Sequence, residues 1–333
     1  MDLIEFKPYK HNSGLTLPQK CLYTRKINGF YVPCGKCEFC RMNKAREWSF
    51  RLESEAFDNF AYNCLLTYDD AHLPYYKGKP SVNRVDVQLF LKRLREAIRK
   101  RFGVKIKFFL CGEYGGNYHR PHYHMILFSP IKLVHGNSNP YKLINDILNS
   151  CWSKGITDIE PLGSVGGSVH YLTSYMTSYS DGIEYDEHNK PFLQMSRCGL
   201  GKNWLDNHPN QVKKMVNEMD YSTVVNGHKV SIPRYLKRKI QPEEQRIAFA
   251  DAYYDYSQNF ENQLNKLSYE ERNKLFKQLK AERIRQYSRE REQYRKGKIH
   301  SNNSNTSQLS RRAETAEKLT SAKRTPKQDT TAL

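Results

Sequence analysis

The chain has 333 residues, and 38% of them are aliphatic, aromatic or cysteine, which is enough to bury a core. Lys and Arg total 54 against 35 Asp and Glu, and the net charge of +19 favours binding to phosphate polyanions through Coulomb attraction and counterion release. No apolar run reaches about 18 residues, and the first residues lack the apolar stretch of a secretory signal. We therefore expect no membrane association, and a reducing cytoplasm in which disulfides are rare.

The first part of the chain alternates helical and strand patterns. Residues 1–41 are expected to form an irregular, cysteine-containing segment. Apolar residues at spacings of three and four then predict helices over residues 42–60 and 84–102. An apolar run predicts a short buried strand over residues 63–68, and the polar residues 69–80 after it are typical of a loop.

An antiparallel hairpin is predicted next, followed by a second helix and strand. The apolar runs at residues 104–111 and 123–128 flank Gly115–Asn117, which is a turn signal. A helix is expected over residues 141–152 and a strand over residues 156–162. This order of elements predicts the α+β class, in which an antiparallel sheet carries flanking helices.

The remaining chain changes in character. Ser168 can cap a helix that runs to about Tyr179, whereas residues 183–233 show no clear pattern. Residues 234–298 are charged and tyrosine-rich with helical propensity, so we expect a basic helical accessory region there. Residues 299–333 lack large apolar groups and are expected to be a disordered tail, which leaves residues 42–233 as the main domain.

Two histidines, His122 and His124, lie on the second strand of the predicted hairpin. Side chains at i and i+2 of a strand share a face, and Ile126 and Phe128 continue that face beside the core. Glu113 ends the preceding strand, so chain reversal can bring it opposite His122. Two nitrogens and a carboxylate suit Mn²⁺ or Mg²⁺, which would polarise a scissile phosphate. For an isolated pair of histidines, the alternative of incidental surface residues stays open.

Three tyrosines, Tyr171, Tyr175 and Tyr179, are spaced by four residues. At roughly 100° per residue they stay within about 80° of each other on a helix, and an adjacent apolar stripe can be buried. The alternative is that they are packing residues. Beside a metal-bound phosphate, however, a phenolate can attack phosphorus, release a 3′-hydroxyl and leave a covalent 5′-phosphotyrosine.

Four cysteines lie near the start of the chain: Cys21, Cys34, Cys37 and Cys40. Thiolates of this sort suit a structural Zn²⁺, with an iron–sulfur cluster as the second interpretation and reduced, partly buried thiols as the third. The cysteines within apolar runs are expected to be ordinary core residues, namely Cys64, Cys111 and Cys151.

Four segments, in order, resemble one protein family. The segment GEYG-x4-RPHYHMILF (residues 112–128) resembles the metal-binding motif of HUH-type endonucleases, specifically the replication initiators of the microvirus and gokushovirus group of single-stranded DNA phages. LLTYDDAHLP (residues 65–74) resembles the strand and loop that precede this motif. PCGKCEFCRMNKAREWSFRLESEA (residues 33–56) and SRCGLGKNW (residues 196–204) resemble the family's N-terminal segment and a later glycine-containing motif.

The resemblance implies an HUH sheet with the histidine pair on a central strand. His122, His124 and Glu113 would be the metal ligands, and Tyr171 and Tyr175 would match the family's pair of alternating nucleophiles. Tyr179 lies beyond that pattern and is expected to be structural.

One departure concerns the residues three positions after each tyrosine. The family commonly has lysine there, whereas this chain has Ser174 and Ser178. A hydroxyl stabilises developing negative charge less well than an ammonium group. Lys202 or His170 could compensate.

The resemblance implies a rolling-circle initiator that nicks single-stranded DNA at an origin, frees a 3′-hydroxyl primer and rejoins the displaced strand. The chain contains no GxxxxGK[ST] motif, so we expect a host helicase, and also a host polymerase, in the cytoplasm of a bacterial cell. Two alternatives are a non-enzymatic, zinc-containing nucleic-acid-binding protein and a metal-dependent nuclease that uses water.

Overall fold

The structure is a computed structural model, and it divides the chain into two compact units. It describes residues 9–10, 16–17, 21, 23–35, 37–115, 118–134, 141–162, 193–196, 199–225 and 228–301. We call Arg51–Asn203 the sheet unit, and Met1–Phe50 with Trp204–His300 the helical unit. The long helix α1 (Glu38–Asp58) contributes residues to both units.

The sheet unit is built on five antiparallel strands in the order β10-β5-β9-β8-β11. Their bounds are Phe60–Thr67 for β5, Lys107–Tyr114 for β8, Pro121–Ser129 for β9, Thr157–Pro161 for β10 and Leu193–Ser196 for β11. The central strand β9 is buried along its whole length, so both of its faces are covered.

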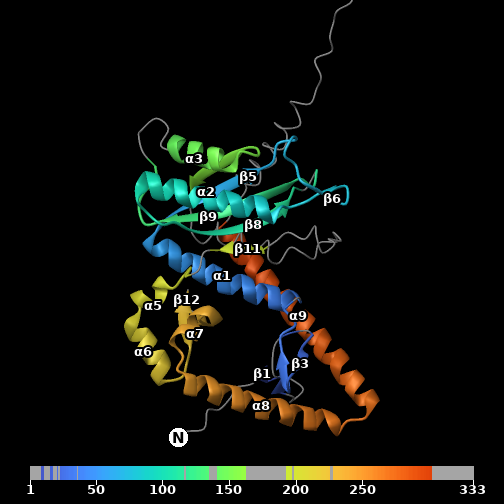
Figure 1. Ribbon diagram of the computed structural model, residues 1–333. Helices are drawn as coiled ribbons and strands as arrows, with labels where there is room; N and C mark the ends of the chain where they lie inside the picture. The colour runs from blue at the N-terminus through green and yellow to red at the C-terminus, as the bar shows by residue number, and fades with distance from the viewer. Residues whose placement is uncertain are drawn as a thin grey trace, which may run out of the picture. The chain divides into compact units, whose positions relative to one another are not determined.

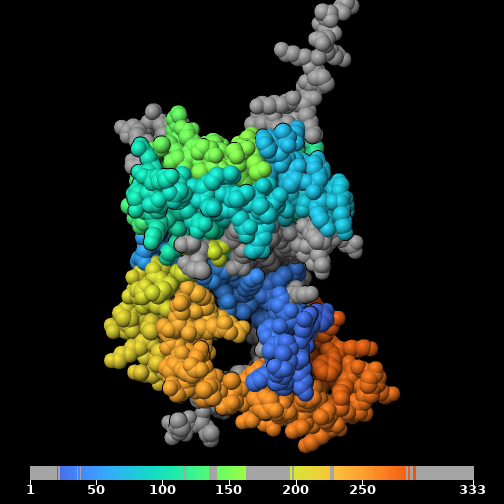
Figure 2. All heavy atoms as spheres, in the orientation of Figure 1, coloured from blue at the N-terminus to red at the C-terminus, as the bar shows by residue number. Residues whose placement is uncertain are grey.

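Helices α2 (Arg84–Phe102) and α3 (Lys142–Trp152) cover one face of this sheet and pack side by side (Figure 1 and Figure 2). The Asn83 side chain accepts hydrogen bonds from two backbone N–H groups in the first turn of α2, and Gly103 ends the helix in the left-handed conformation. Apolar residues of β9 on this face, namely Tyr123, Met125 and Leu127, join the main hydrophobic core.

On the opposite face of the sheet, a carboxylate of α1 is fully buried. Glu55 has no exposed surface, and it accepts hydrogen bonds from Lys107 Nζ at 2.7 Å, Asn59 Nδ2 at 2.9 Å and the Gly201 backbone N–H at 2.8 Å. This group therefore connects α1 with β8 and with the turn at residues 199–202.

Replacing Glu55 with alanine is expected to lower the free energy of unfolding by about 2–4 kcal/mol. The range lies just below the usual cost of breaking a buried pair, because Lys107 keeps partial access to water. Urea unfolding followed by circular dichroism measures the effect. Glu96→Ala removes a surface ion pair with Arg99 on α2 and is the matched control, with little expected change. Equal stability of the two variants would contradict this role of Glu55.

The helical unit contains two short hairpins, one further two-stranded sheet and several helices. The strands are β1 (Tyr9–Lys10), β2 (Thr16–Leu17), β3 (Arg25–Ile27), β4 (Phe30–Val32), β12 (Ser222–Val225) and β13 (His228–Ser231). The helices are α5 (Asn203–Asn207), α6 (Pro209–Asn217), α7 (Arg234–Ile240), α8 (Glu243–Asn265) and α9 (Tyr269–Ser301). One small core lies among α5, α6 and α7, and a second lies between α8 and α9.

Most predicted elements are confirmed, and the α+β class with them. The helices at 84–102 and 141–152, the strands at 63–68 and 156–162, and the hairpin all appear within a few residues of their predicted bounds. No described helix is long and apolar enough to cross a membrane. The predicted helix from Ser168 to Tyr179 lies outside the described residues.

The expectation of an irregular segment over residues 1–41 is wrong in part. This segment forms the β1–β2 and β3–β4 hairpins, and α1 begins at Glu38 rather than at residue 42. The β3–β4 turn is Asn28-Gly29, in which both residues have positive φ, at 47° and 84°. This dipeptide favours a two-residue hairpin turn. The predicted loop at residues 69–80 likewise contains the small β6–β7 hairpin (Tyr75–Tyr76 and Lys79–Pro80).

Candidate metal centre and its surroundings

The register of β8 against β9 brings Glu113 and the two histidines together. Glu113 pairs directly with His122, and Cys111 pairs with His124. Residues that are opposite each other in an antiparallel pair have their side chains on the same face. The expected reversal of the chain is therefore confirmed, and the three candidate ligands lie on the face opposite the main core.

One carboxylate oxygen of Glu113 faces both imidazoles. Glu113 Oε2 lies 3.4 Å from His122 Nε2 and 3.3 Å from His124 Nε2. The histidine side chains are only 7% and 3% exposed, whereas that of Glu113 is 28% exposed. The three groups therefore form a recess that is closed on the histidine side and accessible beside the carboxylate.

The protonation states of this recess suit metal binding. Burial alone would raise the pKa of Glu113, but the hydrogen bonds with His122 and His124 outweigh it and lower that pKa to about 2. Burial lowers the pKa of His124. At neutral pH the carboxylate is charged and the imidazole of His124 is neutral, as metal ligands must be.

The distances between these ligand atoms fit a single divalent cation. Ions of this kind hold nitrogen and oxygen ligands at about 2.0–2.2 Å, which places neighbouring ligand atoms about 3.0–3.5 Å apart. The two Glu113–histidine distances fall in this range. With three protein ligands, further coordination positions stay open for phosphate oxygens or water, which is the arrangement of catalytic rather than structural sites.

A polar network holds the strand that carries the histidines. His122 Nδ1 lies 3.3 Å from the backbone oxygen of Arg120, so an Nδ1–H donor there would leave Nε2 as the metal-binding nitrogen. The Arg120 guanidinium contacts Asp70 Oδ1 at 2.6 Å and donates to the Tyr68 backbone oxygen at 2.9 Å. Sequence analysis missed Arg120 and Asp70, although both lie inside the two motifs it identified.

Tyr123, between the two histidines, is excluded as a nucleophile. Its side chain lies on the opposite face, where its hydroxyl is 3.0 Å from that of Tyr68 and accepts from the Asn83 backbone N–H at 2.8 Å. Burial raises the pKa of both Tyr68 and Tyr123 above the ordinary tyrosine value. These phenols serve the core and the start of α2.

The predicted nucleophiles lie outside the described residues. This holds for Tyr171 and Tyr175, and for Tyr179, His170, Ser174 and Ser178 around them. Lys202 is described, and it is exposed in the turn where its backbone N–H donates to Gly199 O at 3.0 Å.

The seven described cysteines form no disulfides and fall into two groups. Cys21, Cys34, Cys37 and Cys40 lie together in the helical unit. The three cysteines of the sheet unit are buried as expected, namely Cys64, Cys111 and Cys151.

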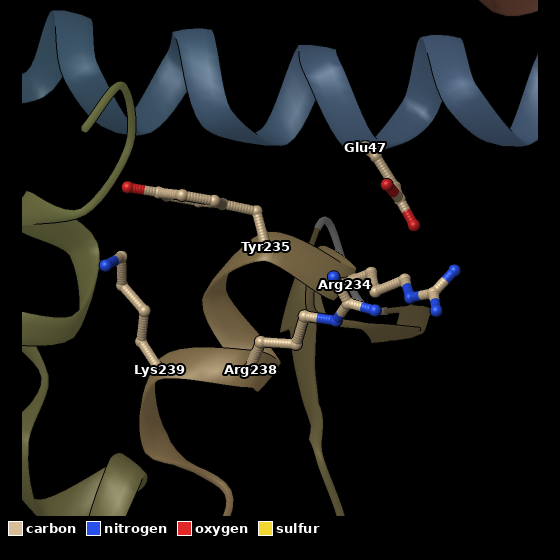
Figure 3. Close-up of a pocket in the computed structure, with 5 residues that line it drawn as sticks. All are labelled: Glu47, Arg234, Tyr235, Arg238 and Lys239. Atoms are coloured by element: carbon tan, nitrogen blue, oxygen red, sulfur yellow. The ribbon is translucent and has the colours of Figure 1, made fainter. Parts of the chain in front are cut away.

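A basic pocket in the helical unit was not anticipated from the sequence. It has a volume of about 480 Å³ and is lined by Glu47, Arg234, Tyr235, Arg238 and Lys239. Figure 3 shows Arg234 and Arg238 on one side of α7 and Tyr235 and Lys239 on another, as i, i+4 pairs, with Glu47 pointing toward them from α1. Lys239 Nζ lies 5.2 Å from the centre of the Tyr235 ring. The run RYLKRKI was the available signal.

Comparison with known proteins places the metal centre in a family context. A family model named for the replication-associated protein ORF2 matches residues 62–180, which include β5, β8 and β9 and the positions of Tyr171 and Tyr175. No solved structure matches the chain significantly.

Three curated relatives come from viruses of bacteria. Replication-associated protein ORF2 of Spiroplasma virus 4 is 27% identical over 253 residues, which cover 73% of this chain and 78% of that protein. Replication-associated protein VP4 of Bdellovibrio phage phiMH2K is 28% identical over 238 residues, or 66% of this chain and 72% of that protein. Replication-associated protein ORF4 of Chlamydia phage 1 is 27% identical over 243 residues, or 68% of this chain and 58% of that protein. The chain is therefore related to the replication-associated proteins of small phages, and its predicted resemblance to the replication initiators of the microvirus and gokushovirus group is confirmed.

Proposed function

We propose that the chain is a rolling-circle replication initiator that nicks single-stranded DNA at an origin and later rejoins the displaced strand. One observation carries the proposal: a single carboxylate oxygen of Glu113 faces the Nε2 atoms of His122 and His124 at 3.3–3.4 Å in a half-open recess. This three-ligand arrangement, on paired strands of an antiparallel sheet in a basic chain, suits the HUH class of endonucleases.

Glu113, His122 and His124 would hold Mn²⁺ or Mg²⁺, since two nitrogens and a carboxylate leave positions for phosphate oxygens. The cation would polarise the scissile phosphate as a Lewis acid. The contact between Arg120 and Asp70 keeps the start of β9 in place beside the loop after β5. The residues of this chain thus position the phosphate, and the bond change belongs to a tyrosine.

Tyr171 and Tyr175 are the proposed nucleophiles. The phenolate oxygen forms a bond to phosphorus while the bond from phosphorus to the 3′-oxygen breaks, and the proton lost by the phenol ends on the released 3′-hydroxyl. The 5′ end stays attached to the tyrosine until a 3′-hydroxyl reverses the step. Two tyrosines allow one to hold an earlier product while the other cuts. Ser174 and Ser178 would leave the phenolate less stabilised than the family's lysines do.

The proposal assigns a role to each segment of the chain. Residues 42–233 would form the nicking domain and residues 234–298 a basic accessory region, with residues 1–41 as a cysteine-containing segment and 299–333 as a tail. A host helicase and polymerase would unwind and extend the nicked strand in the cytoplasm of a bacterial cell.

A cleavage assay separates this proposal from its two rivals. Single-stranded fragments that tile the replicon encoding the chain, labelled at either end, are incubated with the full-length protein and Mn²⁺. The proposal predicts cleavage with a protease-sensitive protein adduct on the 5′ side of the break. Cleavage without any adduct would support a nuclease that uses water, and binding without cleavage would support a non-enzymatic binding protein.

The basic pocket on α7 is expected to contribute to DNA binding. Arg234→Ala/Arg238→Ala should weaken binding to single-stranded DNA, and it should reduce the slope of log affinity against log salt concentration by roughly 1–1.5, because each phosphate contact releases about 0.7 of a counterion on single strands. Fluorescence anisotropy over a salt series measures the slope. Arg99→Ala/Lys100→Ala removes two exposed charges from α2 and should change it less. Equal slopes for the two variants would contradict a role for the pocket.

A further inference from the structure

We propose that Cys21, Cys34, Cys37 and Cys40 form a structural zinc site that joins the start of α1 to the β3–β4 hairpin. The proposal does not depend on nicking, because the four thiols lie in the helical unit and Glu113, His122 and His124 in the sheet unit.

The positions of the four sulfur atoms match the corners of a tetrahedron around one ion. All four lie within 4.8 Å of one another, with Cys21 Sγ 3.8 Å from Cys37 Sγ and Cys34 Sγ 4.0 Å from Cys40 Sγ. Zinc holds thiolates at about 2.3 Å, so neighbouring sulfurs of a tetrahedral site are about 3.8 Å apart. A disulfide requires about 2.05 Å. An iron–sulfur cluster places its own irons and sulfides between the cysteines and needs a wider spacing.

Backbone N–H groups point at these sulfurs. Cys21 Sγ accepts from the Tyr23 N–H at 3.4 Å and from the Cys34 N–H at 3.2 Å, and Cys34 Sγ accepts from the Cys37 N–H at 3.2 Å. Donors of this kind orient metal ligands and stabilise negative charge on them. The loops before and after the hairpin thus supply both the ligands and their supporting hydrogen bonds.

The site is closed, as expected for a structural rather than a catalytic ion. Cys21 is 1% exposed and Cys37 is 8% exposed. Four protein ligands complete a tetrahedral shell and leave no position for substrate.

The surrounding fold lacks the apolar packing that would otherwise fix this segment. All three residues of β3 are exposed, and a two-stranded hairpin is marginally stable by itself. The hairpin contacts α8 through Tyr31, whose ring centre lies 5.4 Å from that of Phe260. Cys37 immediately precedes α1, and Cys40 lies in its first turn. A bound ion would therefore fix the first turn of α1 to a hairpin that already packs on α8.

Metal analysis of the purified full-length chain tests the proposal. Zinc is counted in the His122→Ala/His124→Ala background, so that the other site does not contribute. We expect about one zinc per chain there. Adding Cys34→Ser/Cys40→Ser should remove it, whereas adding Cys151→Ser, which removes a buried thiol outside the cluster, should not. Zinc that is absent from the background, or that persists in the double cysteine variant, would overturn the proposal, as would iron with inorganic sulfide in its place.

Cobalt keeps the test decisive if the cysteine variant fails to fold. The chain with intact cysteines, reconstituted with Co²⁺ in place of zinc, should show the sulfur-to-cobalt charge-transfer and visible d–d absorption of a tetrahedral thiolate site. A spectrum without thiolate charge transfer would rule out coordination by these cysteines.

Discussion

The variant His122→Ala/His124→Ala is expected to lose metal-dependent cleavage, with a rate at least about 10³-fold below that of the native chain. It removes two of the three ligand atoms, and the charge stabilisation by a bound cation is worth several kcal/mol, at about 1.36 kcal/mol for each factor of ten. Salt-sensitive binding to single-stranded DNA should persist, because it rests on the basic surface. The cleavage rate and the binding constant are measured on the same preparations.

His119→Asn is the matched control for this variant. His119 is exposed in the turn between β8 and β9 and has a φ of 49°, a conformation that asparagine also tolerates. Its cleavage rate should equal that of the native chain. Cleavage that persists unchanged in the double histidine variant would exclude the metal centre from the reaction.

The variant Tyr171→Phe/Tyr175→Phe is expected to form no covalent adduct with DNA. Phenylalanine keeps the ring and removes only the hydroxyl oxygen that would bond to phosphorus, so metal binding and DNA affinity should change little. Each single variant should keep part of the activity, because the other tyrosine can attack. Adduct formation is measured by the shift of labelled DNA on a denaturing gel.

Tyr179→Phe is the control within the same spacing pattern and should form the adduct at the native rate. Adduct formation by the double variant at the native rate would show that the nucleophile lies elsewhere. An adduct lost in Tyr179→Phe alone would move the assignment one helical turn along the chain.

The core of the candidate metal centre could be predicted because it depends on local order along the chain. A strand ending in Glu113, a glycine turn and a strand with His122 and His124 fix the register within one hairpin. Alternation along a strand then places the three side chains on one face. The same logic applies to the four clustered cysteines, since three of them lie within seven consecutive residues.

Contacts between distant segments could not be predicted in the same way. The contact between Arg120 and Asp70 joins two motifs that lie 50 residues apart, and nothing in either motif specifies its partner. Glu55 reads as one polar residue of a helix, yet it is fully buried because Lys107 and the Gly201 backbone N–H happen to converge on it. The main core also lies on the Tyr123 face of β9, although Ile126 and Phe128 on the histidine face are equally buried.

The most direct test of the nicking proposal is to identify the residue that carries the DNA. After cleavage of single-stranded origin DNA with Mn²⁺, the adduct is digested with protease and nuclease, and the peptide attached to the 5′-phosphate is sequenced by mass spectrometry. The proposal predicts a phosphodiester on Tyr171 or Tyr175. A peptide linked through any other residue, or cleaved DNA with no peptide attached, would contradict it.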